Sequence, residues 1–450
     1  MSSTISLRES TVVRPSAQTP GGTLWLSNMD LVMPRFHVPY IYFYRPSTGS
    51  TNFFDPRSLR PALSNALVFF YPFAGRLKTG EDGCLAIDCN GEGALFIEAV
   101  TDSAIDDFGD FAPTVHLLKL SPKVDYSNGI SSYPLLLVQV TYFKCGGVSL
   151  MVLVHHSVAD GTASFHSINT WSELARGLSN PSLLPSIDRA QLQANNPPTP
   201  FFHHQEYQAP PSLNTPPPQT NNFNSTAVSI FNISAHQLHL LKSKTKEESH
   251  GITYTTFETL AAHIWRCVCK ARGIPDNQET KLYIPVNGRK RLQPTLSQGY
   301  FGNVLFTATP VAVVGDLMRS GSLSHAAGII HGELGRMDNE YLRSAVDYLE
   351  QVRTNIETAM FGSETFRSPN LRITSWYRMP IHEADFGWGR PVFTGSGIIP
   401  FEGMCLVIPN PLESGSGDGD GGGGGNGGIS LAISLQPDHM NRFGKLLYEF

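Results

Sequence analysis

The sequence has few charged residues and no long apolar run. Asp, Glu, Lys and Arg make up 16% of its 450 residues, and the formal net charge is −5. The densest basic stretch, NGRKR at 287–291, is too short for a nucleic-acid-binding patch, so nucleic acid is not expected as a partner. No apolar run reaches the ~18 residues of a membrane span. The N-terminal MSSTISLREST lacks the apolar core of a signal peptide, so we expect neither a membrane anchor nor secretion.

Cysteine is also scarce, and its spacing fits no metal site. The six residues are Cys84, Cys89, Cys145, Cys267, Cys269 and Cys405. Cys267 and Cys269 are too close together for a CxxC zinc knuckle, and in so long a chain the cysteines are interpreted as free thiols. We therefore expect a cytoplasmic protein in a reducing compartment, without a bound metal.

Hydrophobic residues are plentiful, at 41% of the chain, which is enough for large cores. A Pro-, Asn-, Ser- and Thr-rich stretch at 195–226 cannot hold a continuous helix or an inner strand. It divides the chain into a predicted N-terminal domain (1–194), a crossover linker (195–226) that lies along a surface, and a C-terminal domain (227–450). The glycine tract at 414–428 is predicted to be a hairpin loop.

The remaining pattern mixes helices and strands. Two β-rich runs flank KCGG and predict a hairpin over 134–158. Apolar spacing, caps and turn residues predict helices over 162–178, 255–273 (with Thr255 or Thr256 as cap and Gly273 as stop), 344–362 and 437–450. Strands are predicted over 281–288, 371–381, 403–410 and 428–435. The fold class is α+β (α/β two-layer), with mixed or antiparallel sheets in each half.

The stretch LVHHSVADGTASF (153–165) is the first candidate for chemistry. It lies where the second strand of the hairpin gives way to a helix, and Gly161 allows the sharp turn. Neighbouring side chains on a strand point to opposite faces, so only one of His155 and His156 can enter a given site. An imidazole can remove a proton at neutral pH, and Asp160 could hold it or its loop. A satisfied polar pair at a strand end is the simpler alternative.

Other catalytic patterns are missing. The chain has no GxSxG nucleophile elbow, no HExxH metal motif, and no phosphate-binding glycine loop between a strand and a helix. ADFGWGRP (384–391) is the second unusual stretch. Taken alone, it predicts a tight aromatic turn, with Phe386 and Trp388 buried and Gly387 and Gly389 in unusual backbone conformations.

Together, HHSVADG with His156 and Asp160, and DFGWG at 385–389, resemble the plant BAHD acyltransferase family. Several further stretches resemble its branch that uses hydroxycinnamoyl-CoA donors, above all the shikimate/quinate transferases. They are FYPFAGRL (70–77), CNGEG (89–93), DDFGDFAP (106–113), VTYFKCGGVSL (140–150), YFGN (300–303) and PNLRITSW (369–376).

The resemblance implies two chloramphenicol-acetyltransferase-like domains joined by the crossover, with a tunnel between them. His156 would be the general base that deprotonates the acceptor hydroxyl as it attacks the thioester, without an acyl-enzyme. Asp160 would hold the histidine loop through an ionic partner, and Asp385 would be an architectural member of the catalytic set, paired with an arginine for which Arg289 is a candidate. Acyl-CoA would be a co-substrate, no cofactor or metal would be required, and the protein would be a monomer.

The resemblance also assigns the binding residues. Thr374 and Trp376 would lie near the oxyanion. The acyl and acceptor pocket would be lined by His37, Tyr40, Tyr42 and Phe361, although strand alternation prevents all of the first three from lining it. The CoA site would comprise Thr253, Tyr254, Thr255, Gly288, Arg289, Arg291, Ser375 and Arg378.

Two residues depart from the shikimate-specific pattern. Phe361 stands where that branch has an arginine that clamps the acceptor carboxylate, and a phenyl ring cannot pair with a carboxylate. Either Arg353, Arg367 or Arg372 takes over, or the acceptor is not shikimate. Tyr40 stands where many relatives have serine, which narrows the pocket.

Several acceptors and one non-enzymatic alternative follow. Shikimate or quinate is favoured, 4-hydroxyphenyllactate or another aromatic alcohol comes second, as in a rosmarinic-acid-synthase-like enzyme, and an amine comes third. The alternative of another class is a non-catalytic relative that binds acyl-CoA, against which the intact His156 and Asp160 argue.

Overall fold

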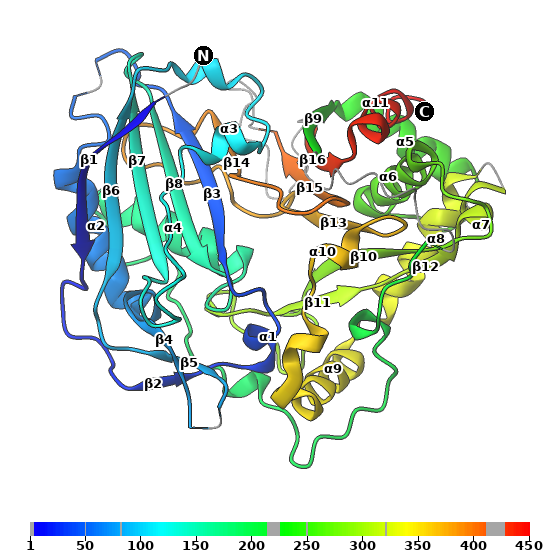
Figure 1. Ribbon diagram of the computed structural model, residues 1–450, viewed down its shortest axis with the longest axis horizontal. Helices are drawn as coiled ribbons and strands as arrows, with labels where there is room; N and C mark the ends of the chain where they lie inside the picture. Colours follow the sequence, from blue (N-terminus) through cyan, green and yellow to red (C-terminus); the bar gives the residue numbers. More distant parts are fainter. Residues whose placement is uncertain are drawn as a thin grey trace.

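Two β-sheets lie side by side in this protein, each with its own helices (Figure 1). A computed structural model describes residues 4–49, 51–81, 83–213, 226–248, 251–319, 322–410 and 428–450. None of the helices in these ranges is long and apolar enough to cross a membrane. The mixed α/β architecture agrees with the predicted fold class.

The first sheet contains six strands, and five of them come from the N-terminal half. In spatial order they are β1 (Ile5–Val13), β6 (Ala94–Thr101), β7 (Leu136–Phe143), β8 (Val148–His155), β3 (His37–Tyr44) and β14 (Phe393–Ser396). β6 and β7 run parallel and the other neighbours run antiparallel. β7 and β8 form the predicted hairpin. A small sheet of β2 (Thr23–Trp25), β5 (Leu85–Asp88) and β4 (Arg76–Thr79) accompanies it.

Strand alternation assigns the two faces of this sheet to different cores. On β3, Tyr40 and Tyr42 enter the larger core, while Ile41 and Phe43 enter a smaller one. The larger core is covered by two helices that pack on each other, α2 (Pro56–Phe69) and α4 (Gly161–Ala175). α4 corresponds to the helix predicted over 162–178.

The second sheet contains seven strands, all from the C-terminal half. Along its main path they are β11 (Leu305–Ala308), β10 (Glu279–Asn287), β13 (Leu371–Ser375), β15 (Met404–Pro409), β16 (Ile429–Leu435) and β9 (Ala227–Ile233), and β12 (Val311–Val313) pairs with β10. β13 is parallel to both of its neighbours. Four helices pack together beside this sheet: α5 (Ala235–Glu248), α6 (Thr256–Arg272), α8 (Leu323–Arg336) and α11 (Pro437–Leu446).

The caps of α6 are those expected from the sequence. Thr255 accepts from the backbone N–H of Glu258, and the Glu258 carboxylate accepts from the Thr255 N–H. Gly273 ends the helix at φ 61°, a left-handed conformation that favours glycine. The other helices are α1 (Asn28–Leu31), α3 (Val115–Leu118), α7 (Val314–Arg319), α9 (Asn339–Gln351) and α10 (Ser363–Phe366).

Two predicted elements are wrong in extent. The helix predicted over 344–362 ends at Gln351 as α9 and continues as a 3₁₀ segment, Arg353–Ala359. The strand predicted over 371–381 ends at Ser375, because the Met379 N–H turns back to the Trp376 carbonyl. In both cases apolar residues continue past the element because they face a neighbouring part of the protein.

The chain does not divide strictly at the predicted linker. β14 lies far beyond 195–226 but pairs with β3 in the N-terminal sheet, where Gly395 is opposite Ile41. This pairing satisfies the backbone groups that the edge of β3 would otherwise expose. Sequence periodicity gives no information on which sheet an edge strand joins.

The described part of the linker, which was expected to lie along a surface, lies against α9. The backbone N–H groups of Asn195 and Thr199 donate to Asp347, and Tyr207 stacks on Tyr348. Residues 214–225 and the glycine tract up to residue 427 lie outside the described residues. The hairpin that the tract was predicted to close is present, since Pro409 pairs with Ile429.

Candidate active site

β8 ends at His155, and His156 is the first residue of the turn that follows. His155 has no exposed surface and packs against the rings of His37 and Tyr133. His156 lines a cavity of about 1410 Å³. Its backbone is held on both sides, because its N–H donates to Phe36 at 3.0 Å and its carbonyl accepts from Asn303 at 2.8 Å. Only one of the two histidines lines the cavity, as expected, although the strand itself ends at His155.

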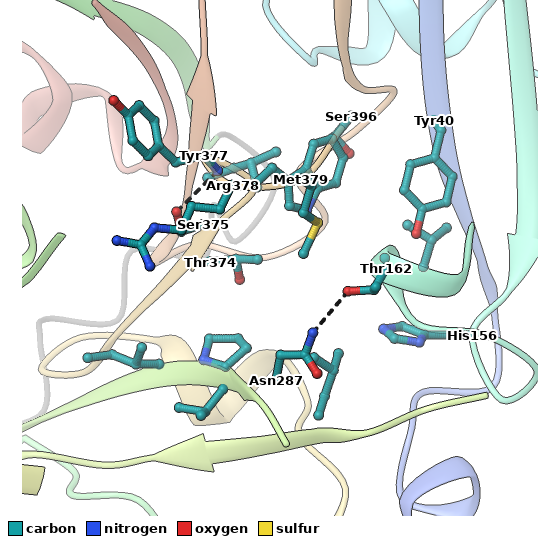
Figure 2. Close-up of a pocket in the computed structure, with 18 of the residues that line it drawn as sticks. Tyr40, His156, Thr162, Asn287, Thr374, Ser375, Tyr377, Arg378, Met379 and Ser396 are labelled. Atoms are coloured by element: carbon teal, nitrogen blue, oxygen red, sulfur yellow. Dashed lines mark hydrogen bonds between the residues drawn. The ribbon is translucent and has the colours of Figure 1, made fainter. Parts of the chain in front are cut away.

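The cavity lies between the two sheets. Its walls include Phe36, Tyr40 and Thr162 from the N-terminal half, and Asn287 and Thr374 from the C-terminal half. Figure 2 shows the His156 ring entering from one wall and Thr374 and Ser375 on the opposite one. Single small-molecule sites usually measure about 300–1,000 Å³, so this cavity has room for more than one ligand. That it opens at both ends stays a prediction.

The surroundings of His156 favour its neutral form. Burial lowers the pKa of the imidazole below its ordinary value, and the positive charge of Arg372 lowers it further, while Asp160 and Asn303 oppose this. Nδ1 is buried without a hydrogen-bond partner in the described structure. A neutral imidazole at neutral pH can accept a proton from a ligand in the cavity.

Asp160 is fully occupied by structural contacts. Its Oδ2 accepts from Arg289 Nη1 at 2.7 Å and from the Val304 N–H at 3.0 Å. Its Oδ1 accepts from Arg289 Nη2 and the Ala163 N–H, both at 3.0 Å, so it also caps the N-terminus of α4. The ion pair is buried and joins the two halves next to the histidine loop. Asp160 thus has the ionic partner that was expected for it.

The predicted pairing of Asp385 with Arg289 is wrong, because Asp160 already holds this arginine. Asp385 instead accepts from the N–H groups of Gly387 and Gly389, at 2.8 and 2.9 Å, and Arg176 donates to its backbone carbonyl. Both glycines have positive φ, 101° and 98°, which the turn requires. Asp385 does not line the cavity, and its contacts are those of a turn.

A second buried ion pair supports the histidine and was missed from sequence. Asp30 Oδ1 accepts from both the backbone and side-chain N–H groups of Asn303, at 2.9 and 3.0 Å. Its Oδ2 accepts from Arg189 Nε at 3.0 Å, and Arg189 also donates to the Val158 carbonyl. Asn303 in turn holds the His156 carbonyl. YFGN was noted at 300–303, but nothing in the sequence pointed to Asp30 or Arg189.

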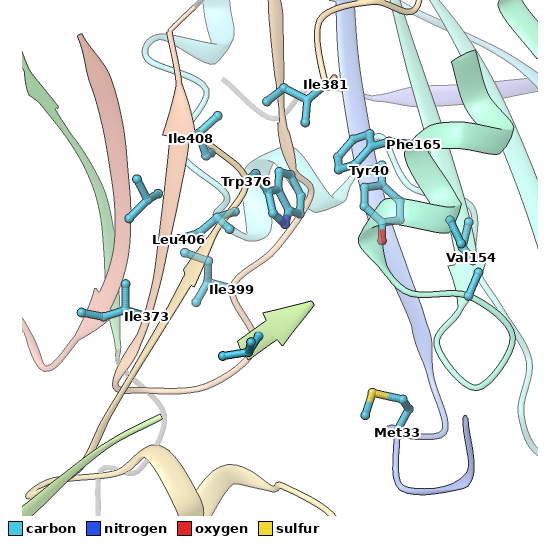
Figure 3. Packing of buried hydrophobic residues seen from close by; sticks show 14 of the residues in the cluster. Met33, Tyr40, Val154, Phe165, Ile373, Trp376, Ile381, Ile399, Leu406 and Ile408 are labelled. Atoms are coloured by element: carbon cyan, nitrogen blue, oxygen red, sulfur yellow. The ribbon is translucent and has the colours of Figure 1, made fainter. Parts of the chain in front are cut away.

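The acyl and acceptor wall contains some of the predicted residues. Tyr40, Phe361 and Trp376 line the cavity, and Trp376 stacks on Tyr40 with ring centres 5.6 Å apart. Figure 3 shows these two rings next to each other within the larger core. His37 also lines the cavity, but both its nitrogens are engaged, with the Tyr126 hydroxyl and the Pro134 carbonyl.

Tyr42 is not part of the cavity wall. It shares the face of Tyr40 but is fully buried in the core, two residues further along β3. The expectation that not all of His37, Tyr40 and Tyr42 line the cavity is met, but His37 and Tyr40 belong to opposite faces of β3 and both line it, so position along the strand decides. Thr374 and Trp376, expected near an oxyanion, both line it.

The predicted CoA residues divide into two groups. Thr255, Arg289, Arg291, Ser375 and Arg378 line the cavity. Thr253, Tyr254 and Gly288 do not: Thr253 is exposed elsewhere, Tyr254 packs on His331, and a Cβ at Gly288 would meet the Phe306 ring at 2.5 Å.

Two of the lining arginines have other partners. Arg289 is paired with Asp160, and Arg291 Nη1 donates to the Leu334 and Met337 carbonyls. The exposed Lys290 also lines the cavity, although it was not predicted. No cluster of metal-ligating side chains occurs in the described ranges.

A neutral histidine that lines a cavity between two sheets, with its backbone fixed next to buried ion pairs, could act as a general base on a ligand bound there. Residues 3–449 match the family model described as the Transferase family, and the chain belongs to this family of acyltransferases. The resemblance to BAHD acyltransferases is confirmed.

Three relatives cover nearly the whole chain. The chain is 53% identical to a shikimate O-hydroxycinnamoyltransferase from Nicotiana tabacum, covering 99% of this chain and 100% of that protein. It is 49% identical to a hydroxycinnamoyl-CoA:5-hydroxyanthranilate N-hydroxycinnamoyltransferase from Avena sativa, with 98% and 99% covered. It is 48% identical to a rosmarinate synthase from Plectranthus scutellarioides, with 99% of each covered.

Solved structures show the same fold. Vinorine synthase aligns with a TM-score of 0.71 at 21% identity, over 98% of this chain and 96% of that one. F. sporotrichioides TRI101, complexed with coenzyme A and T-2, aligns with a TM-score of 0.69 at 17% identity, over 94% and 97%.

Proposed function

We propose that the protein transfers a hydroxycinnamoyl group from its CoA thioester to the hydroxyl of a small acceptor, with shikimate or quinate favoured. The observation that carries this proposal is the position of His156. It reaches a cavity large enough for two substrates, and its backbone is fixed from both halves. Relatives that are 53% and 52% identical over nearly the whole chain are named as hydroxycinnamoyltransferases.

In the proposed mechanism, His156 removes the proton from the acceptor hydroxyl while the oxygen attacks the thioester carbonyl. The tetrahedral intermediate carries an oxyanion, which needs a hydrogen-bond donor. The Thr374 hydroxyl and the Trp376 indole N–H are the candidates on the cavity wall. The C–S bond then breaks, the ester carbonyl re-forms, and the imidazolium returns its proton to the CoA thiolate. No acyl-enzyme is formed.

We assign the two substrates to different parts of the cavity wall, according to the chemistry of the residues that line it. CoA is highly anionic and needs cations or helix N-termini. Lys290 and Arg378 are exposed cations on the cavity wall, and Thr255 caps the N-terminus of the long helix α6. We assign these residues to CoA. The aromatic residues Tyr40, Phe361 and Trp376 are assigned to the acyl group and the acceptor. As the resemblance suggests, the enzyme would act as a cytoplasmic monomer.

Measurement of CoA release from p-coumaroyl-CoA tests the proposal. The acceptor panel comprises shikimate, quinate, 4-hydroxyphenyllactate and an aromatic amine. The amine is included because the Avena sativa relative is named as an N-hydroxycinnamoyltransferase. Release that depends on an added acceptor supports transfer, and the preferred acceptor ranks the alternatives. Binding of p-coumaroyl-CoA without release for any acceptor would support the non-catalytic alternative.

The acid limb of the pH profile of kcat/KM should have its midpoint below the ordinary pKa of histidine. Because burial lowers the pKa of His156 from 6.5, the reactive neutral form persists to lower pH. We expect the midpoint of the acid limb of kcat/KM at saturating donor to lie below pH 6.5, because protonation of the imidazole removes the base. A limb with its midpoint above 6.5 would contradict the assignment of His156 as the base.

A further inference from the structure

Arg372 places a positive charge inside the cavity, on a central strand of the C-terminal sheet. It lies on β13, opposite Tyr283 of β10 and Met404 of β15. Ile373 points into the core with no exposed surface, while Arg372 and Thr374 point to the cavity. A charge in the middle of a sheet is costly unless it is paired or has a specific task.

Three of the buried arginines in the described chain show what pairing looks like here. Arg189 pairs with Asp30, Arg289 with Asp160, and Arg272 with Glu402, at 3.0, 2.7 and 2.7 Å. Arg372 has no carboxylate partner within the described residues. The one hydrogen bond of its side chain in the described structure runs from Nε to Thr374 Oγ1 at 3.3 Å, so its Nη groups have no protein partner there.

Aromatic rings hold the guanidinium in place. The guanidinium carbon lies 5.1 Å from the ring centre of Phe366 and 5.8 Å from that of Phe361. Such stacking fixes the plane of the guanidinium but uses none of its N–H groups. Phe361, which cannot itself bind a carboxylate, therefore serves as part of a platform for an arginine that can.

The charge is permanent and acts on the proposed base. Burial lowers the pKa of Arg372 to about 10, so the group stays protonated at neutral pH. Its charge also contributes to the lowered pKa of His156, which places both groups within electrostatic reach of one bound ligand.

The two other arginines considered from sequence are engaged elsewhere. Arg353 donates to Asn28 Oδ1 and lies near Glu350, and Arg367 pairs with Glu364 at the surface. Neither lines the cavity.

We infer that Arg372 binds a carboxylate of the acceptor through its free Nη groups, and that the enzyme selects acceptors in which a carboxylate accompanies the attacking hydroxyl. The inference rests on the proposed function and narrows its acceptor class. A carboxylate matches the fork of a guanidinium and would compensate the buried charge. The contact would also direct the acceptor toward His156.

The inference is tested by comparing kcat/KM for an acceptor acid and for its methyl ester, in wild type and in variants of Arg372. We expect wild type to prefer shikimate over methyl shikimate, and Arg372→Gln to reduce kcat/KM for the acid by at least about tenfold, the value of one hydrogen bond to a charged group. In the same variant, kcat/KM for the methyl ester and the KM for p-coumaroyl-CoA should each change by less than about threefold. Arg372→Lys should keep part of the preference. Arg367→Gln is the matched control and should behave as wild type.

Two results would overturn the inference: an equal loss for acid and ester, or a loss that appears in the donor KM. If wild type transfers to none of the acceptors, the proposed function has failed, and binding still decides the role of Arg372. Shikimate should then raise the Tm of wild type more than methyl shikimate does, and Arg372→Gln should abolish the difference. Equal shifts in wild type would reject carboxylate recognition itself.

Discussion

Replacing His156 with alanine is expected to lower kcat for CoA release by at least the ~10²–10⁴-fold that a positioned general base contributes. Neither aspartate of the predicted catalytic set is placed to take over. Asp160 has both oxygens occupied by Arg289 and by backbone N–H groups, and Asp385 lies outside the cavity. The measurement is acceptor-dependent CoA release at saturating p-coumaroyl-CoA.

The control for this variant is another histidine of the same cavity. His166 lines it from α4, and its Nε2 contacts the Leu183 carbonyl. His166→Gln should retain kcat within a few fold. The Tm of His156→Ala should stay within about 3 °C of wild type, because the variant removes no ion pair and no backbone hydrogen bond. Retention of most activity by His156→Ala would refute the mechanism.

Breaking the buried pair of Asp160 and Arg289 should have the largest effect on stability. Asp160→Asn keeps a side chain able to cap α4 but leaves the Arg289 guanidinium buried without a counter-ion. Loss of one partner of such a pair costs about 3–5 kcal/mol. The free energy of unfolding, measured with urea, should fall by that amount, and kcat should fall with it because the pair adjoins the histidine loop.

An exposed ion pair gives the comparison. Glu364 and Arg367 lie at the surface, 3.0 Å apart, and Glu364→Gln should change the free energy of unfolding by less than about 1 kcal/mol. The double variant Asp160→Asn/Arg289→Met should be more stable than Asp160→Asn alone, since it removes the unpaired charge. A loss below about 1 kcal/mol for Asp160→Asn would show that the pair is not important for stability.

Local patterns in the sequence predicted local features of this site well. The expectation that only one of His155 and His156 enters the cavity was met, and cap chemistry placed both ends of α6, because neighbours in sequence determine these features. The face of Tyr40 and Tyr42 was also predictable. Which of the two reaches the cavity was not, since that depends on where the second half meets the first.

Contacts between the halves were beyond such patterns. Arg289 could pair with Asp160 or Asp385, and only the packed structure shows that it pairs with Asp160. The same holds for Asp30 with Asn303, and for β14 with β3. The sequence offered Arg353, Arg367 and Arg372 as equal candidates for binding a carboxylate. Arg372 differs from the other two because it has no acidic partner in the described structure.

The pairing of β14 with β3 restricts how ligands can enter. Because a strand from the C-terminal half is part of the N-terminal sheet, a hinge motion that parted the two halves would have to break its backbone hydrogen bonds. The buried ion pair of Asp160 and Arg289, which joins the two halves, would have to be separated as well. Ligand exchange should therefore proceed by rotamer changes at the mouths of a rigid enclosure, which keeps the distance between the base and the opposite wall constant through each turnover.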